Sequence, residues 1–261
     1  MKTLSFFFLT IMMLHGFSTF YEAQAVDEFL AMYFPFDDGK GEVAKDRSKF
    51  QNDGKIEGAK WVNGKFDQAL YFDGKSYVAV MPGEEVSIGQ ETTWAMWFET
   101  DVEGQGAFLA TLHGTMVLYF SGGAISAQSW TNPGAALWNP VNSNVFAKGG
   151  EWYHIAATWS EESGKITIYV NGQEKNSAVA AGKVSFKSSR QLAIGGNDQI
   201  TYPGTNLFDG IIDEFRIYNR ALSKDEIRES MSALDVLPKG KLPIAWGELK
   251  RITNYELRIT N

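Results

Sequence analysis

The strongest constraint on the fold of this chain is a succession of short alternating segments separated by turn-forming dipeptides. In 165–170, for example, Ile166, Ile168 and Val170 fall on one side of an extended chain, and the residues between them fall on the other. Asn or Asp followed by Gly, which adopts the positive φ of tight hairpins readily, separates many such segments. These dipeptides occur at 53–54, 63–64, 73–74 and 171–172. The pattern predicts antiparallel strands.

Strand-like segments recur from residue 29 to residue 218, and a helix is indicated only after them. The segments are 29–36, 69–72, 77–80, 92–99, 107–112, 116–120, 153–159, 165–170, 191–194 and 210–218. In 223–231, Ser223 and Glu226 have the spacing of a capping box, which marks the start of a helix. We therefore expect an all-β protein, a two-sheet antiparallel jelly-roll sandwich with one short C-terminal helix.

The N-terminus has the features of a secretory signal peptide. Lys2 precedes an apolar run at 4–14, and the run is followed by the small-residue cleavage motif Ala-Gln-Ala at 23–25. The run is shorter than the roughly 20 residues that span a bilayer, which disfavours the alternative of an uncleaved anchor. We expect a secreted or cell-surface protein with no membrane span after cleavage. The expected divisions are a signal peptide at 1–25, one domain at 26–234 and a C-terminal extension or linker at 235–261.

Composition excludes several classes of function. The chain has no Cys, so disulfides, zinc fingers and thiol nucleophiles are ruled out. Its net charge of −7 argues against a nucleic-acid partner. Only His113 and His154 follow the predicted signal peptide, and His154 lies within a strand-like segment, where we expect a structural role.

Six segments follow one another in the order and spacing of a known domain family. They are 33–41 (YFPFDDGKG), 44–54 (AKDRSKFQNDG), 64–74 (GKFDQALYFDG), 152–158 (WYHIAAT), 168–172 (IYVNG) and 210–223 (GIIDEFRIYNRALS). Together they resemble the LamG-like jellyroll domains of the concanavalin A-like lectin/glucanase superfamily, over about residues 29–230. The resemblance implies first and last strands that lie side by side, a role in binding or adhesion and, as in many members, a structural Ca²⁺.

The implied calcium ion needs oxygen ligands, and acidic residues occur in the two segments that the resemblance brings together. Ca²⁺ takes six to eight oxygens, so two or three carboxylates suffice when backbone carbonyls supply the rest. We expect Asp46 and Asp213 as ligands, followed by Asp37 and by carbonyls near Asn52. The alternative is that Asp46 and Asn52 hold turns and that Asp213 caps a strand end.

A second acidic pattern suggests an enzyme. Glu99, Asp101 and Glu103 are spaced by two, which would place all three on one face of a strand. Laminarinase-type hydrolases of the superfamily use a similar E-x-D-x-E strand, and a retaining glycosidase needs its two carboxyls about 5–5.5 Å apart. However, glycines follow at 104 and 106, where the resemblance indicates the end of the strand. We therefore expect a non-catalytic protein, with a retaining β-glucanase as the alternative.

Two long loops contain the residues best suited to a ligand. The loops are 121–150 and 195–208, and both combine aromatic residues with Asn, Gly and Pro. Aromatic rings stack on the C–H faces of sugars while amides bond the hydroxyl groups. The candidate ligand-binding residues are Trp130, Trp138, Asn197 and Tyr202. They predict a partner that is a glycan or a cell-surface or extracellular protein. The alternatives are that the tryptophans fill the core, or that the domain serves adhesion without a small ligand.

Overall fold

The computed structural model describes residues 27–83, 86, 88–132, 139–184, 189–200 and 203–234. The predicted signal peptide and the predicted C-terminal extension lie outside these residues, so both remain predictions. Within the described part of the chain, no helix is long and apolar enough to span a membrane.

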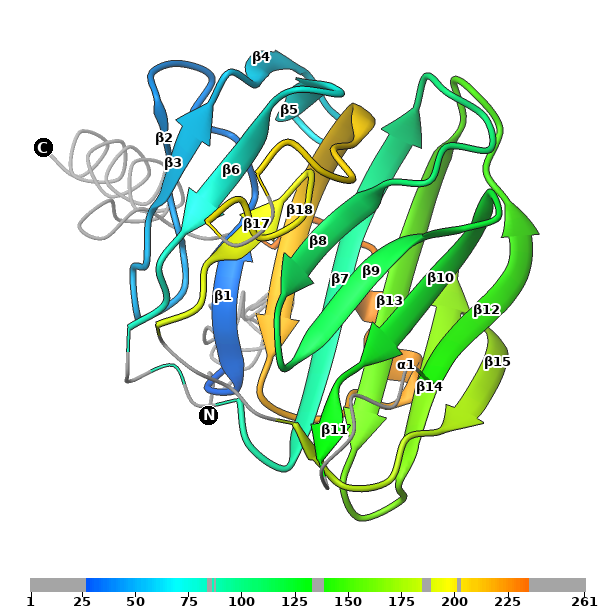
Figure 1. Cartoon of the computed structure of the whole chain (residues 1–261). Coiled ribbons are helices and arrows are strands. Elements are labelled where there is room, and N and C mark those ends of the chain that lie inside the picture. Colours follow the sequence, from blue (N-terminus) through cyan, green and yellow to red (C-terminus); the bar gives the residue numbers. More distant parts are fainter. Residues whose placement is uncertain are drawn as a thin grey trace, which may run out of the picture.

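Two antiparallel sheets of eight strands each stack face to face, which confirms the predicted all-β sandwich (Figure 1). The first sheet runs β15 (Gln173–Val179), β14 (Lys165–Val170), β13 (Trp152–Ser160), β7 (Glu91–Thr100), β18 (Asp209–Tyr218), β5 (Gln68–Asp73) and β4 (Lys60–Asn63), and β1 (Leu30–Phe34) also pairs with β18. The second runs β12 (Asn139–Phe146), β10 (Ala124–Ser129), β9 (Met116–Ser121), β8 (Phe108–Leu112), β17 (Leu192–Ile194), β6 (Tyr77–Val80), β3 (Gly54–Glu57) and β2 (Val43–Ala44). A two-stranded ribbon joins β11 (Thr131–Asn132) to β16 (Lys183–Val184).

The core lies between the sheets and is filled by alternate residues of each strand. On β9, Met116, Leu118 and Phe120 belong to the core, and Val117 between them does not. Phe98 of β7 meets Phe120 edge to face with ring centroids 5.6 Å apart, so one aromatic pair joins the two sheets. The period of two that predicted the strands is therefore the period at which they bury their apolar side chains.

The last strand contains a β-bulge that the alternation did not reveal. The register of β18 against β7 shifts between Asp213 and Arg216, and Glu214 has a φ of 56°. Because of the extra residue, Ile212 and Phe215 both face the core although they are three positions apart. Asp213, Glu214 and Arg216 stay outside that core.

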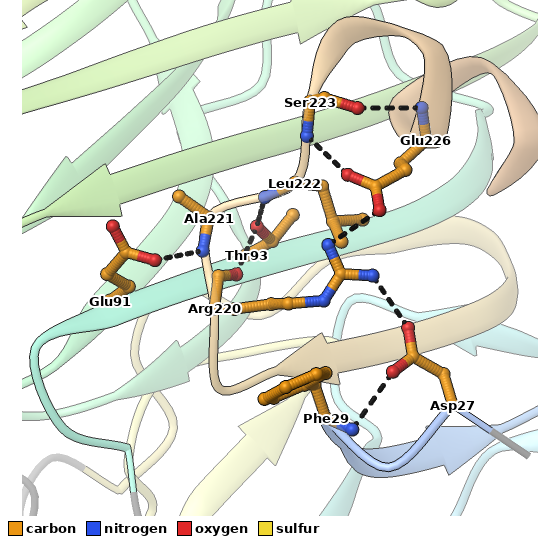
Figure 2. Close-up of polar contacts among 9 residues, drawn as sticks. All are labelled: Asp27, Phe29, Glu91, Thr93, Arg220, Ala221, Leu222, Ser223 and Glu226. Atoms are coloured by element: carbon orange, nitrogen blue, oxygen red, sulfur yellow. Dashed lines mark hydrogen bonds and ion pairs between the residues drawn. The ribbon is translucent and has the colours of Figure 1, made fainter.

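The expected helix forms as α1 (Lys224–Glu229), and its capping box is present. Figure 2 shows the two reciprocal bonds: the hydroxyl of Ser223 accepts from the amide of Glu226 at 3.4 Å, and the Glu226 carboxylate accepts from the amide of Ser223 at 2.7 Å. Arg220 then bridges the Glu226 carboxylate at 2.8 Å and the Asp27 carboxylate at 2.9 Å. This bridge fixes the helix to the residues just before β1.

The segment after α1 covers part of the outer face of the first sheet. Arg216 donates to the carbonyl oxygens of Ser230 at 2.6 Å and Ser232 at 2.7 Å, and the indole of Trp97 donates to the carbonyl of Met231 at 2.9 Å. His154 is buried beside Trp97, with ring centroids 5.3 Å apart. Burial lowers the pKa of His154 to about 3, so this residue is neutral and unsuited to acid–base catalysis at neutral pH.

Candidate functional site

Asp46, the first expected calcium ligand, uses its carboxylate to hold its own loop. One oxygen accepts from the amides of Tyr33 at 2.9 Å and Ser48 at 2.8 Å, and the other accepts from the Ser48 hydroxyl at 2.8 Å and the Asn52 amide at 2.9 Å. The residue is 3% exposed. With these four donors, the carboxylate bonds to the backbone of β1 where a neighbouring strand would otherwise do so, and it holds the turn at 46–52. These contacts are the ones expected if Asp46 holds a turn.

The first and last strands do lie side by side, but this does not bring Asp46 to Asp213. β1 pairs with β18 along one edge, with Tyr33 opposite Arg216. Along its other edge, the backbone of Tyr33 bonds to Asp46 and Arg47 instead. Asp46 and Asp213 are therefore separated by β1, and no group of three or more acidic or histidine residues in the described ranges could hold a metal ion.

Asp213 has the environment of a cation ligand. It is completely buried; one carboxylate oxygen accepts from the Phe66 amide at 3.0 Å, and the other has no hydrogen-bond partner among the described residues. Burial, with smaller contributions from the charges of Glu214 and Asp37, raises the pKa of Asp213 to about 8. A Cβ on Gly64 would lie 2.6 Å from the Asp213 carboxylate, so only a glycine at position 64 lets the backbone come this close to that carboxylate.

Asp37, the third expected ligand, is exposed, and its charge contributes to the raised pKa of Asp213. The pKa of Asp37 is itself raised, mainly by partial desolvation. One of its oxygens accepts from the Gln68 amide at 3.3 Å. Asp37 and Asp213 are therefore coupled through their charges, and the assignment of metal ligands stays a prediction.

The strand face required by the hydrolase alternative is not formed. β7 ends at Thr100, and Asp101 and Glu103 lie in the turn that follows. Glu103 accepts from the Gly149 amide at 3.3 Å. Because only Glu99 remains on the strand, the spacing of two no longer places the three carboxylates on one face.

The structure brings two of the four expected ligand-binding residues together through a histidine. The ring of Trp130, after β10, lies 5.0 Å from the ring of His113, which follows β8. The other side of His113 meets Asn197, with 2.8 Å between the His113 Nε2 and the Asn197 Oδ1. Trp138 and Tyr202 lie outside the described residues. Sequence reasoning did not select His113, because a single His in a short hairpin turn has no distinguishing pattern.

The loop that carries Asn197 is fixed by its own side chains. The Asn197 side chain also donates to the Thr205 hydroxyl at 3.3 Å, and its carbonyl accepts from the Gln199 side chain at 2.8 Å. Next to it, Asp198 is 1% exposed and lies 3.8 Å from the guanidinium of Arg190. We refer to His113, Trp130, Arg190, Asn197 and Asp198 as the Trp130 cluster. Trp130 is half-buried and outside the core, so the core-filling alternative does not apply to it.

A cavity of about 690 Å³ opens near the contacts of Figure 2. Its lining consists of Phe29, Gln90, Glu91, Glu161, Glu162, Asn219 and Arg220. The charge of Arg220 is neutralised by Asp27 and Glu226, and Glu91 accepts from the Ala221 amide at 3.1 Å. These contacts stabilise the connection to α1, so we do not place the functional site here.

Comparison with known proteins gives a family match over more than half of the chain. Residues 72–228 match the family Laminin_G_3, described as the concanavalin A-like lectin/glucanases superfamily. The mouse pentraxin-related protein PTX3 is 28% identical over 120 residues, which are 42% of this chain and 30% of the relative. The human adhesion G-protein coupled receptor D1 is 34% identical over 110 residues, 41% of this chain and 12% of the relative. The chain thus matches less than a third of the length of either relative.

Solved structures share the fold at low sequence identity. Domain 4 of AbnA, an extracellular arabinanase from Geobacillus stearothermophilus, was solved with arabinotriose; its TM-score is 0.63 at 20% identity, over 78% of this chain and 98% of that one. The binding domain of botulinum neurotoxin DC in complex with SialylT has a TM-score of 0.60 at 14% identity, over 78% of this chain and 51% of that one. These likenesses concern the fold alone.

Proposed function

The chain belongs to the concanavalin A-like lectin/glucanases superfamily, and on that premise we propose that it is a non-catalytic recognition domain that binds glycans at the Trp130 cluster. The observation that carries the proposal is the convergence of Trp130, His113 and Asn197 from three separate loops. Binding sites on a rigid sandwich typically consist of residues from different loops that meet at one place.

The chemistry of the cluster suits a sugar. The Trp130 ring is a flat apolar surface of the kind that packs on sugar C–H groups, and the partly exposed guanidinium of Arg190 lies 3.8 Å from the carboxylate of Asp198. Asn197 is 5% exposed and already bonded to His113 and Thr205, so it acts as a positioning residue that fixes the histidine against the indole. Such a fixed arrangement lowers the entropy lost on binding.

Binding rather than hydrolysis is supported by the end of β7 at Thr100, which leaves the acidic triplet without a common strand face. Two of the structural neighbours were solved as binding domains or with a sugar ligand, arabinotriose in one case and SialylT in the other. Export from the cell follows from the predicted signal peptide and is consistent with the extracellular arabinanase.

A structural Ca²⁺ at Asp213 and Asp37 is the second part of the proposal. A buried carboxylate with an unbonded oxygen and a second carboxylate nearby is costly without a compensating positive charge. When bound, Ca²⁺ would supply that charge and stabilise the folded state. Asp46 is not part of this site, because all its contacts are with N–H and O–H donors of the chain.

An array of immobilised neutral oligosaccharides, arabinotriose among them, tests the glycan proposal. We expect the wild-type protein to bind a subset of them, and Trp130→Ala to weaken that binding by about tenfold or more, since a stacked aromatic contributes on the order of 1 kcal/mol or more beyond its buried area. Trp61→Ala is the matched control, because Trp61 on β4 is also half-buried and lies on the other sheet. Equal binding by all three proteins would contradict the proposed site.

A further inference from the structure

The cavity beside the connection to α1 lies at one end of the first sheet, where four neighbouring strands begin or end. In the order β13, β7, β18 and β1, each of these strands pairs with the next. The described lining comes from residues at their ends: Glu161 and Glu162 after β13, Gln90 and Glu91 where β7 begins, Asn219 and Arg220 after β18, and Phe29 before β1. The register of the sheet therefore brings together residues that are far apart in the sequence.

Backbone hydrogen bonds hold these strand ends in place. The Glu161 amide donates to the carbonyl of Gln90 at 2.8 Å, and the Asn219 amide donates to the carbonyl of Phe29 at 2.9 Å. Gln90 and Glu162 are exposed, so the cavity is open to solvent. A ligand would thus enter a site that is already formed, which lowers the entropy lost on binding.

The cavity has an excess of negative charge. Three carboxylate side chains line it, those of Glu91, Glu161 and Glu162. Arg220, the cation in the described lining, does not neutralise them, because its guanidinium binds two other carboxylates at 2.8 Å and 2.9 Å (Figure 2).

Each of the three carboxylates can take a new partner. Glu162 forms no ion pair with the residues that the structure describes. One oxygen of Glu91 accepts from the Ala221 amide at 3.1 Å, and in Figure 2 the other oxygen bonds to none of the residues drawn. Glu161 is 3.5 Å from the ammonium of Lys183, whose side chain is 73% exposed. Surface pairs of this kind contribute little to stability, so a ligand can replace Lys183 at little cost.

Phe29 adds an aromatic surface beside the carboxylates. It is 41% exposed, and the guanidinium of Arg220 lies over its ring, with 5.3 Å between the Arg220 Cζ and the ring centroid. Arg220 is thus an internal example of a guanidinium held by an aromatic ring and two carboxylates. The exposed part of the Phe29 ring and the three remaining carboxylates offer the same combination to a second guanidinium.

The dimensions of the cavity suit an organic cation better than a metal ion. Across the described ranges, the acidic and histidine residues form no group of three or more that could hold a metal ion, so these carboxylates do not converge on one point. The volume of about 690 Å³ falls within the roughly 300–1,000 Å³ of small-molecule sites. A guanidinium is planar and has five N–H donors, so it can reach several carboxylates while its face stacks on a ring.

We propose that this cavity binds a guanidinium group, from a small molecule or from an arginine side chain of a partner protein, through Glu91, Glu161, Glu162 and Phe29. The site is separate from the Trp130 cluster, whose aromatic and amide residues follow strands of the second sheet. It therefore does not depend on glycan binding.

Titration calorimetry at low ionic strength tests the ligand class. Three probes are added to the purified protein: ethylguanidine, a blocked Gly-Gly-Arg-Gly-Gly peptide, and the same peptide with citrulline, which has the shape of arginine without its charge. We expect saturable binding of a guanidinium probe, roughly tenfold or more tighter than that of the citrulline peptide, because hydrogen bonds to charged groups are the stronger ones. Tighter binding of the arginine peptide than of ethylguanidine indicates a protein partner, and the reverse order indicates a small molecule.

Two variants test the residues. Glu162→Gln should weaken binding about three- to fivefold, the size of one exposed charge pair. Phe29→Leu keeps the apolar bulk but removes the ring, and it should weaken binding about two- to fivefold. Glu42→Gln is the matched control, because Glu42 is exposed, precedes β2 of the second sheet and removes the same charge.

The proposal is overturned if neither guanidinium probe binds, or if the citrulline peptide binds as tightly as the arginine peptide. It is also overturned if Glu42→Gln weakens binding as much as Glu162→Gln does, since the attraction would then reflect only the net charge of the protein.

Discussion

Arg216 and Glu214, two residues apart on β18, form an ion pair from which water is excluded, with side-chain exposures of 0% and 1%. The β-bulge puts both on the outer side of the sheet, where Arg216 also binds the carbonyls of Ser230 and Ser232. Glu214 in turn accepts from the hydroxyl of Tyr33 at 2.9 Å. One buried pair therefore joins the first strand, the last strand and the segment after α1.

Removing one partner of this pair should be more harmful than removing both. Arg216→Met leaves Glu214 buried without its counter-charge, and we expect a loss of about 3–5 kcal/mol in the free energy of unfolding. Arg216→Met combined with Glu214→Gln should recover a large part of that loss. Urea unfolding of the two single variants and the double variant measures the coupling. Additive losses would show that the pair does not act as a unit.

His154 should make the protein less stable at acid pH. Its pKa is about 3 in the folded state because it is buried, against an ordinary value of 6.5. Between these values the unfolded chain binds a proton that the folded chain does not, so stability falls as the pH falls from 6.5 toward 3. His154→Phe removes this contribution, while the carboxylates titrate alike in both proteins. The stability difference between the two proteins should therefore shift in favour of the variant as the pH falls; a difference that stays constant across this range contradicts the assignment.

Asp46→Ala should destabilise the protein whether or not Ca²⁺ is present. The change leaves the amides of Tyr33, Ser48 and Asn52 without their acceptor, at a cost of about 1–3 kcal/mol for each one that stays buried and unpaired. Thermal melting with Ca²⁺ and with EDTA measures the effect. A Tm loss that appears only with Ca²⁺ would instead identify Asp46 as a metal ligand.

Asp213→Asn should give the opposite pattern at the proposed cation site. Without Ca²⁺ the variant should be at least as stable as the wild-type protein at pH 8, because a buried charge without a counter-charge is removed. Added Ca²⁺ should raise the Tm of the wild-type protein by mass action and leave that of the variant unchanged. A wild-type Tm that is insensitive to Ca²⁺ and EDTA, with no metal in the purified protein, contradicts the cation site.

Local patterns in the sequence predicted most of the fold. The alternation at 165–170, the Asn-Gly at 171–172 and the capping box of Ser223 and Glu226 act over a few residues, so their physical basis is visible in the chain itself. The bulge at Glu214 was not predictable, because it depends on the register against β7. The end of β7 at Thr100 was indicated only by the glycines that follow the acidic triplet.

The candidate site was predicted only in part because its members meet through tertiary structure. Trp130 and Asn197 were selected by residue type and loop composition, but His113, which joins them, was not. The cavity that Glu162 lines was not predictable either, because its residues meet through the register of four strands. The four donors around Asp46 were not foreseen, because carboxylates that bind backbone amides and carboxylates that bind Ca²⁺ are alike in sequence.

The central claim is that a glycan binds against Trp130, and the most direct test is the indole N–H signal of that residue in a ¹H–¹⁵N NMR titration. The oligosaccharide selected on the array is added to the wild-type protein, and the Trp130 signal is assigned by its loss in Trp130→Phe. We predict that this signal shifts on saturation, while those of Trp94 and Trp159, which are fully buried in the core, stay in place. Saturable binding that leaves the Trp130 signal unmoved would contradict the account.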